Sequence, residues 1–586
     1  MYYTNGNYAA FSKARKPEKV EKKRAYIIGG GLAGLSAAVF LIRDGQMPGE
    51  NITILEELGL PGGGCDGIKD QRLGYIIRGG REMENHFECL WDLYRSIPSL
   101  KNPGQSVLYE FYYLNMDDPS SSPVRVTEKQ GQDAHTYQKF TLSDKALLEI
   151  SALVMAPEEK LNGKTIRDVF GQEFFESNFW LFWRSMFAFE DWHSAMEMRR
   201  YLTRFIHHTR KLTDLSCLKF TTYNQYESLI LPLIRYLEAQ GVKFRYGAVT
   251  ENVLFTSKGS KRFASAIIMK DGTSIPLSAD DLVFTTLGCN TENSAYGDQG
   301  HAPVVPEGIG ASWELWKNIA AQASDFGKPE TFYGDVSASN WESATITCID
   351  ERIPAYIRKL TGRDPYCGKI VTGGPITAKD SSWLMSWTVS RQPHYAVQKP
   401  NELVAWVYGL FSDVPGDFIK KPMKECTGKE ICEEWLYHIG VPENEIEELA
   451  AHHAVTIPCM MPYVTSYFMV RDVSDRPNIV PAGAVNFAFI GEHVETPRDT
   501  VFTTEYAVRT GMEAVYTLLN LDRGVPEVFA SCYDVRALLD ATASLMDGRK
   551  LTDMKLGFME KIALDALLKR TKGTIVEEML QNYNLI

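Results

Sequence analysis

The first part of the chain joins short apolar runs through a glycine-rich turn and a helical pattern. Residues 25–28 (Ala-Tyr-Ile-Ile) form an apolar run without polar alternation, which is typical of a strand buried on both faces. A glycine-rich stretch at 29–34 follows, and apolar residues then continue through 35–42 as in a helix. A second apolar run at 52–55 predicts the next strand. The pattern therefore predicts a strand–helix–strand unit in a parallel sheet.

Similar buried strands are predicted much later in the chain. They are residues 241–247, 249–255, 282–288 and 487–490. The last of them closes on Gly491 and Glu492, and the segment after Thr500 predicts a helix that ends near Leu519. We interpret this late strand and helix as returning to the first sheet, so that one domain is built from separated segments. An ordinary buried strand and helix is the alternative.

The glycines of the first turn have the spacing of a dinucleotide-binding motif. Gly29 allows a tight turn, Gly31 lets a pyrophosphate approach the backbone, and Gly34 lets the helix pack closely on the strand. The phosphates would lie at the positive end of the helix. Glu56 follows the second strand, where an acidic side chain can hold the ribose hydroxyls of adenosine. A purely structural glycine turn is the alternative for the motif taken alone.

A second glycine-rich turn at 61–67 and the late segment at 487–492 favour FAD over NAD as the cofactor. We expect the backbone near Val253 to lie close to the adenine. The FAD-binding residues predicted from these patterns are Gly29, Gly31, Ala33, Gly34, Glu56, Val253, Gly491 and Glu492.

Composition excludes several classes of protein. The 586 residues are 44% hydrophobic and 23% charged, which is globular usage. The net charge of −12 has the opposite sign to that of a general nucleic-acid binder, so we predict no nucleic-acid partner. Ten cysteines without a CxxC pair predict reduced thiols and a cytoplasmic location. We expect neither a secretory signal nor a membrane-spanning helix, because no apolar run is long enough.

We predict an α/β fold with an FAD-binding Rossmann-like domain of the two-domain flavoprotein type, a mixed α/β substrate lobe and a helical C-terminal extension. The predicted domains are an N-terminal tail at 1–24, a discontinuous FAD-binding domain at 25–118, 205–295 and 476–530, a substrate-binding or lid lobe at 119–204 and 296–475, and the C-terminal helical extension at 531–586.

Longer motifs give the chain a family resemblance. The segment Arg78-Gly-Gly-Arg81-Glu82-Met83 puts an acid just past a doubled glycine, where we expect a helix to begin. Further motifs are Met-Arg-Arg-Tyr at 198–201, Tyr-Asn-Gln-Tyr at 223–226, Thr-Val-Ser-Arg-Gln-Pro-His-Tyr at 388–395 and Gly-Glu-His-Val-Glu-Thr-Pro-Arg-Asp at 491–499. Together with the FAD motif, and along nearly the whole chain, they resemble the oleate hydratases, flavoproteins once called myosin-cross-reactive antigens.

The resemblance implies an enzyme that adds water across a cis double bond of an unsaturated fatty acid, typically oleate to 10-hydroxystearate, with bound FAD and no net redox change. It implies that Tyr201 protonates the alkene and that Glu82 activates the attacking water. Both residue types suit the reaction, because an isolated alkene needs an acid and the developing cation needs a water molecule. Positive charge at Arg199 or Arg200 would help the weakly acidic phenol. The alternative is that Glu82 caps a helix and Tyr201 is a core residue.

The resemblance also implies the group that holds the substrate carboxylate. It falls on Gln225, Thr388, Ser390 and His394, with serine standing where the family pattern has asparagine. Neutral donors and a histidine can hold a carboxylate at the far end of an apolar tunnel without a buried arginine charge. A capping histidine in a turn is the alternative for His394. Five further residues are implied near the flavin phosphates or ring, namely Gly63, Gly64, Arg81, Met83 and Thr503.

Two segments suggest lipid contact. Residues 174–189 are rich in aromatic and methionine side chains and line either a tunnel or an ordinary core. Residues 549–572 carry seven basic and three acidic side chains, with apolar residues at helical spacing. This predicts a basic amphipathic helix for an anionic membrane surface, with packing on the protein itself or on a dimer partner as the alternative. The resemblance implies a homodimer.

Two other functions remain open at this point. One is a redox flavoenzyme of the amine oxidase or desaturase type, because folds of this kind host many chemistries. The other is a non-catalytic fatty-acid-binding flavoprotein. We predict no metal, because the histidines do not join cysteines at ligand spacing and we expect the adjacent pairs at 207–208 and 452–453 to point apart on a helix.

Overall fold

The computed structural model of the chain describes residues 12–65, 67–80, 82–136 and 138–586. These residues fall into two compact units. The larger takes in the described residues up to Asp133, then Leu218–Met469 and Val473–Phe529. The smaller is Ala134–Cys217, Val470–Asp472 and Ala530–Ile586. Both units are therefore built from separated stretches of sequence.

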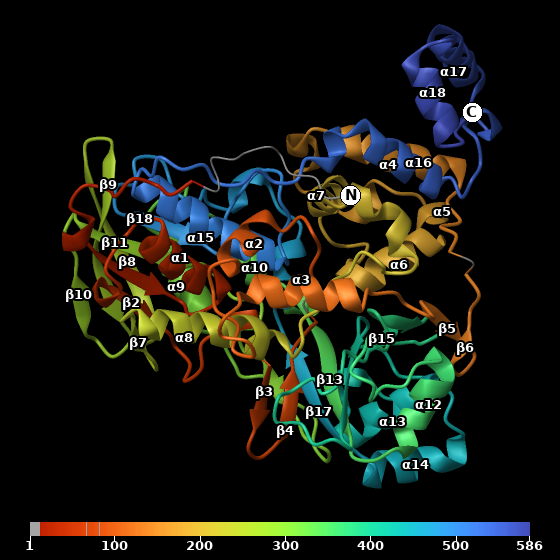
Figure 1. The fold of residues 1–586 in the computed structure, drawn as a ribbon, viewed down its shortest axis with the longest axis horizontal. Helices are drawn as coiled ribbons and strands as arrows, with labels where there is room; N and C mark the ends of the chain where they lie inside the picture. The colour runs from red at the N-terminus through yellow and green to blue at the C-terminus, as the bar shows by residue number, and fades with distance from the viewer. Residues whose placement is uncertain (1–11, 66, 81, 137) are drawn as a thin grey trace. The chain divides into compact units, whose positions relative to one another are not determined.

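A parallel five-stranded sheet organises the N-terminal part of the larger unit (Figure 1). Its strands, in spatial order, are β18 (Phe487–Ile490), β11 (Asp281–Thr286), β1 (Arg24–Ile28), β2 (Ile52–Leu55) and β7 (Lys243–Arg245). The predicted strands at 25–28, 52–55 and 487–490 are confirmed, and the late strand does return to the first sheet by pairing with β11. The carboxyl ends of the strands meet at one edge, which is the ligand-binding edge of such sheets.

Helices pack on this sheet through glycines. Helix α1 (Leu32–Arg43) follows β1, and α15 (Thr504–Leu518) is the helix predicted after residue 500. A Cβ atom on Gly511 of α15 would lie 2.7 Å from the Ser36 Oγ and 2.8 Å from the Ala33 carbonyl oxygen of α1. Only glycine therefore permits this approach of two helices that are more than 450 residues apart in sequence.

Strand β8 (Thr250–Lys258) continues from the parallel sheet into a separate three-stranded sheet with β9 (Lys261–Met269) and β10 (Ser274–Pro276). Helix α8 (Leu231–Ala239) precedes β7, and α9 (Ala311–Ala320) contacts β8. The hairpin of β3 (Gly67–Asp70) and β4 (Gly74–Ile77) meets the next sheet, where the Ile77 amide donates to the Thr345 Oγ1 at 2.8 Å.

A mixed eight-stranded sheet forms the rest of the larger unit's framework. Its order is β12 (Ala295–Tyr296), β17 (Ala454–Met461), β13 (Trp341–Cys348), β16 (Leu403–Gly409), β15 (Met385–Thr388), β14 (Ile376–Ala378), β5 (Val126–Glu128) and β6 (Gln132–Asp133). Every residue of β13 and β16 is buried. Helices α12 (Arg352–Thr361), α13 (Gly428–His438) and α14 (Glu443–His452) contribute to one apolar core with these strands.

The smaller unit is mainly helical. It contains α4 (Asp144–Met155), α5 (Gln172–Phe175), α6 (Asn178–Phe187), α7 (Ala195–Arg204), α16 (Val535–Leu545), α17 (Phe558–Thr571) and α18 (Ile575–Asn582). Serines cap α4 and α6, since Ser143 and Ser177 accept hydrogen bonds from the amides of Ala146 and Trp180. A fully buried ion pair of Arg471 and Glu197, at 2.7 Å, fastens the short stretch 470–472 to this unit.

The C-terminal helix α17 differs from the prediction. Residues 558–571 are helical, but their apolar side chains lie around the helix, and Phe558 and Met559 are 80% and 73% exposed. The prediction of an amphipathic helix is wrong, because Leu564 and Leu568 place apolar side chains on the face opposite Met559, Ile562 and Ala566. None of the helices in the described ranges combines the length and the apolar composition needed to cross a membrane. All ten cysteines are free thiols.

A buried ion cluster on α13 fixes a loop of the larger unit. The Glu434 carboxylate accepts the amides of Asp417, Phe418 and Ile419 at 2.7–2.9 Å. His438 lies 3.2 Å from Glu434 and 3.4 Å from Asp417. Burial alone would lower the pKa of His438, but hydrogen bonds to the two carboxylates raise it to about 9. These three side chains place their ligand atoms within 4.8 Å of one another, but a protonated imidazole is a poor metal ligand.

Replacing His438 with glutamine should lower the free energy of unfolding by about 3 kcal/mol near pH 6, because the buried Glu434 and the partly exposed Asp417 lose their cation. The folded-state pKa of His438 lies above the unfolded value of 6.5. Its contribution is therefore complete below pH 6.5 and is lost as the pH rises through about 9.

Denaturant unfolding between pH 6 and pH 10 checks this, with His452→Gln as the matched control because that side chain is 67% exposed. A wild-type advantage over His438→Gln that stays constant from pH 6 to pH 10 would contradict the ion-pair account.

Candidate functional site

The turn between β1 and α1 is rich in glycine, so no side chains of these glycines cover its backbone. Gly29 has φ +97°, and a Cβ atom there would lie 2.8 Å from the Thr286 Oγ1. A Cβ atom on Gly34 would lie 2.1 Å from the Gly29 carbonyl oxygen, so this position packs the helix on the turn. Gly31 is different, since its nearest neighbour would be the Gly63 Cα at 3.8 Å. Gly31 thus leaves open space at the start of α1, where no side chain caps the amides.

Two neighbouring cavities adjoin this turn, and both are lined by Gly31 and Gly63. The larger, about 630 Å³, is also lined by Gly29 and Glu56. The smaller, about 110 Å³, is lined by five more of the residues predicted for FAD, namely Ala33, Gly64, Gly491, Glu492 and Thr503. The structure therefore brings together predicted residues from positions 29 to 503 of the chain.

Three predicted cofactor residues lie outside both cavity linings, and a fourth is not described. Gly34 packs α1 on the turn, and Val253 is fully buried in β8, with Thr250 of the same strand lining the larger cavity instead. Met83 is buried and forms a backbone bridge with Lys219 outside both cavity linings. Arg81 lies outside the residues that the structure describes.

Acidic side chains gather in the larger cavity. Glu56 accepts the Gly30 amide at 2.7 Å and the Leu58 amide at 2.9 Å, and burial raises its pKa. Burial, followed by the charges of Glu292 and Glu56, raises the pKa of Glu57 to about 7. This end of the cavity therefore suits a neutral hydroxylated group such as a ribose better than an additional phosphate.

A third cavity, about 40 Å³, unites the other predicted site residues of the larger unit. It is lined by Glu82, Gln225, Thr388, Ser390 and His394. Thr388 ends β15, while Val404 and Trp406 of β16 supply apolar walls. The size suits a head group, not a whole acyl chain.

Hydrogen bonds fix these polar side chains. The Gln225 Nε2 donates to the Gly79 carbonyl oxygen at 3.0 Å, and the Thr388 and Thr372 hydroxyls lie 3.0 Å apart. The His394 amide donates to the Gln398 Oε1 at 2.8 Å. Burial lowers the pKa of His394 to about 4, so its ring is neutral near pH 7. Neutral donors thus surround this cavity, as the resemblance implies for a carboxylate site.

Glu82 is not at the start of a helix, contrary to the prediction, because α2 (Glu88–Tyr94) begins only at Glu88. The bridge from Met83 to Lys219 holds the preceding segment extended, and the Glu84 carboxylate accepts the His86 amide at 2.6 Å. A Cβ atom on Gly80 would lie 2.8 Å from the Glu82 Oε1, so the doubled glycine makes room for this carboxylate.

Tyr201 belongs to the smaller unit, on α7, and is 1% exposed. Its ring packs against those of Phe187, Phe189 and Phe205 at centroid distances of 5.0–5.6 Å. Two of these phenylalanines come from the aromatic segment 174–189. Arg199 and Arg200, considered as positive charges for Tyr201, form ion pairs with Glu158 at 3.2 and 2.6 Å.

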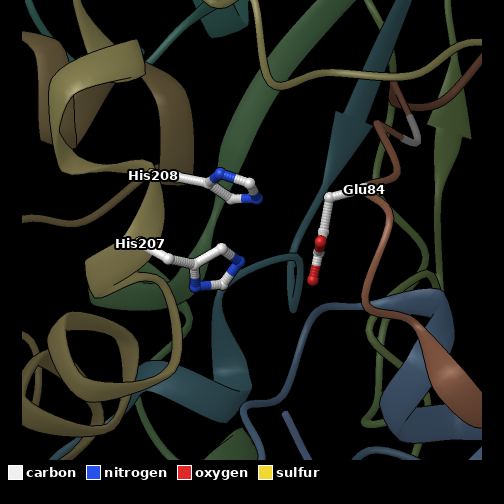
Figure 2. Close-up of side chains that lie close together, drawn as sticks. All are labelled: Glu84, His207 and His208. Carbon is white, nitrogen blue, oxygen red and sulfur yellow. The ribbon is translucent and has the colours of Figure 1, made fainter. Parts of the chain in front are cut away.

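The adjacent pair His207 and His208 does not point apart, contrary to the prediction. Both come from the 3-10 helix η7 (Ile206–Leu212), and their ring centroids are 3.9 Å apart. Figure 2 shows the two rings next to one another. The His207 Nδ1 lies 2.9 Å from the Ser531 Oγ, which orients that ring. The figure also draws Glu84, which precedes α2.

The sequence profile of the MCRA family matches residues 22–516. The chain belongs to the MCRA family. An oleate hydratase of Streptococcus pyogenes serotype M49 (strain NZ131) is 50% identical over 595 residues, covering 100% of both chains. A linoleate hydratase of Lactiplantibacillus plantarum is 31% identical over 90% of this chain and 99% of its own length.

Solved structures show the fold of this MCRA chain. A putrescine oxidase with redesigned cofactor binding is 11% identical and has a TM-score of 0.51, covering 85% of this chain and 99% of its own. A cyclohexylamine oxidase from Brevibacterium oxydans IH-35A gives the same identity, coverage and TM-score. The predicted α/β fold of the two-domain flavoprotein type is therefore confirmed.

Sequence reasoning missed several residues of the MCRA chain that line the cofactor cavities. Arg78 is buried, and its guanidinium donates to the Gly63 carbonyl oxygen at 2.6 Å. Cys289 and Thr286 line both cavities from the end of β11. Arg78 begins the motif that contains Glu82, which was a usable signal. For Cys289, the only signal in the sequence was its position after a predicted buried strand.

Proposed function

We propose that this protein is an FAD-bound hydratase that adds water across a cis double bond of unsaturated fatty acids, with oleate converted to 10-hydroxystearate. The observation that carries the proposal is the cavity in which Glu82 joins Gln225, Thr388, Ser390 and the neutral His394. Full-length similarity to an oleate hydratase supports the same substrate class.

The reaction needs one acid and one base. Tyr201 gives its hydroxyl proton to one alkene carbon, and Glu82 takes a proton from the water whose oxygen bonds to the other carbon. Solvent removes the proton from Glu82 and returns one to the Tyr201 oxygen, so atoms and charge balance and no electrons are transferred. Gln225, Thr388 and His394 hold the carboxylate by hydrogen bonds, with Ser390 acting directly or through a bridging water.

The cofactor cavities fit FAD. The open space at Gly31 faces Gly63 across the turn, and the uncapped amides of α1 suit a pyrophosphate. Glu56 would hold the ribose, while Gly491, Glu492 and Thr503 would line the space for the flavin half. When bound, FAD supplies shape and electrostatics to the site without a net change of its redox state.

A redox flavoenzyme remains the second candidate, because the fold is shared with amine oxidases. Incubating the purified protein with FAD and oleate separates the candidates. A hydratase gains one water per fatty acid without oxygen uptake, whereas an oxidase consumes oxygen. A non-catalytic carrier binds oleate and returns it unchanged.

Replacing Gly31 with valine should weaken FAD binding at least about tenfold, or about 1.4 kcal/mol, because the new side chain fills the space meant for the pyrophosphate. Flavin fluorescence titration measures the affinity. The control Gly104→Val also adds a side chain in open space, away from the cavities. Equal FAD affinities for Gly31→Val and Gly104→Val would contradict the proposal that the pyrophosphate binds at Gly31.

Replacing Glu82 with glutamine or Tyr201 with phenylalanine should each lower kcat about 10²- to 10⁴-fold, because each removes one proton-transfer group. Product formation measured by mass spectrometry checks this. Glu425→Gln and Tyr533→Phe, both exposed, are the matched controls. Full activity in either site variant would overturn that residue's assigned role.

We also infer a cytoplasmic protein that attaches peripherally to anionic membranes through 549–572. The exposed Phe558 and Met559 beside seven basic side chains support this contact. The homodimer stays a prediction from the family resemblance.

Changing Phe558 and Met559 together to aspartate should abolish co-sedimentation with phosphatidylserine vesicles, because two apolar anchors become charged. Val304→Asp, at a residue that is 85% exposed in the other unit, is the control. Vesicle binding that survives the double substitution would refute attachment through this helix.

A further inference from the structure

A surface pocket of about 250 Å³ lies beside the Glu82 cavity in the larger unit. Its apolar lining comes from the start of α3 (Val107–Asp117), from the start of α8 and from the loop after His394. The apolar residues are Leu100, Val107, Phe111, Leu231, Pro232 and Ala396. At this size the pocket holds part of an acyl chain, since sites for whole ligands span about 300 to 1,000 Å³.

A single short segment separates this pocket from the Glu82 cavity. Thr221 and Tyr223 line both of them. The Thr221 hydroxyl donates to the Tyr223 carbonyl oxygen at 2.5 Å, and the segment runs into a π-helix at Tyr226–Ile230. Such π-helical turns are rare and occur frequently at functional sites. The segment Thr221–Tyr223 thus forms the wall between the pocket and the Glu82 cavity.

The pocket lining carries two carboxylates, Glu110 and Glu227, and one lysine. Lys101 is exposed and is the one cation among the described lining residues. The lining acids are already engaged, because Glu110 accepts from the Ser99 and Thr222 hydroxyls and Glu227 accepts from the Ala396 amide. A fatty acid carboxylate therefore meets a positive side chain, with the acidic oxygens turned to internal donors.

The face of α3 opposite the pocket lining carries a separate apolar stripe. Tyr109, Tyr112, Tyr113 and Met116 recur there at helical spacing and are 45–59% exposed. The Tyr113 ring lies 4.6 Å from that of Tyr109 and 5.2 Å from that of Tyr112. This stripe is not part of the pocket, so the portal rests on the pocket lining alone.

We propose that this pocket is the portal through which long-chain carboxylates reach and leave the Glu82 cavity, with the Thr221–Tyr223 segment as its gate. The carboxylate-binding side chains lie directly behind the gate. The substrate's acyl tail therefore passes the gate first, and its carboxylate follows and binds at Gln225 and His394. The product leaves through the same gate with its carboxylate directed toward Lys101. The proposal rests on the proposed function for the identity of its ligand.

Blocking the portal should slow binding without changing affinity, because a portal affects the rates of association and dissociation equally. Ala396→Trp places a large ring at an exposed lining position, and Val397→Trp adds the same ring at the next residue, which is 60% exposed and outside the lining. Stopped-flow fluorescence with cis-parinaric acid, on the FAD-loaded full chain, should show both rate constants lowered at least tenfold in Ala396→Trp only. An association rate equal to that of Val397→Trp, or a loss of affinity at unchanged association rate, would overturn the portal.

Charge reversal gives a second test that does not depend on packing. Lys101→Glu should lower the association rate severalfold at low salt, with the difference fading at high salt, whereas Lys369→Glu should leave it unchanged. No salt-dependent difference between these variants would contradict the role of Lys101. Hydration of oleate is assayed separately. Slowed binding in Ala396→Trp, with no product from the wild type, would refute the proposed function but not the portal. Normal binding in Ala396→Trp, with product from the wild type, would refute the portal but not the proposed function.

Discussion

The close approach of backbone to backbone at the β1–α1 turn is the constraint on which the cofactor region depends. No side chain fits at Gly34, because a Cβ atom would lie 2.1 Å from the Gly29 carbonyl oxygen. This packing directs the start of α1 at the carboxyl edge of the sheet, beside the ends of β11 and β18. Gly511 likewise allows a close approach between α15 and α1 that no side chain would permit. Segments from both ends of the chain consequently meet around two adjoining cavities.

The cavity that Glu82 lines also contains buried hydrogen-bonding side chains that carry no charge, namely Gln225, Thr388 and His394. Thr388 and Trp406 come from neighbouring strands of the eight-stranded sheet, and Gln225 comes from the start of the π-helix. Burial keeps His394 neutral, so the lining can donate hydrogen bonds without carrying a buried cation. Glu82 enters the same cavity from an extended segment next to a glycine pair. The proposed function therefore requires the neutral donors to lie between the substrate head group and Glu82.

The sequence predicted the parallel sheet well because its signals are local. Apolar runs such as 52–55 and the glycines of the first turn act through their own backbone. The eight-stranded sheet could not be predicted in detail, because β13 is buried on both faces yet contains Glu342, Ser343, Thr345 and Thr347. The start of α2 was misplaced because a long-range bridge from Met83 to Lys219 decides it. The clustering of Gln225 with Thr388 followed from resemblance, since no spacing rule joins residues so far apart.

The most direct test of the account is the source of the added oxygen. The FAD-loaded protein is incubated with oleate in H₂¹⁸O under ordinary air, and the lipid is analysed by mass spectrometry. The account predicts a hydroxy acid whose new oxygen is ¹⁸O, with no oxygen consumed. A product whose oxygen comes from air, or a desaturated product, would contradict it.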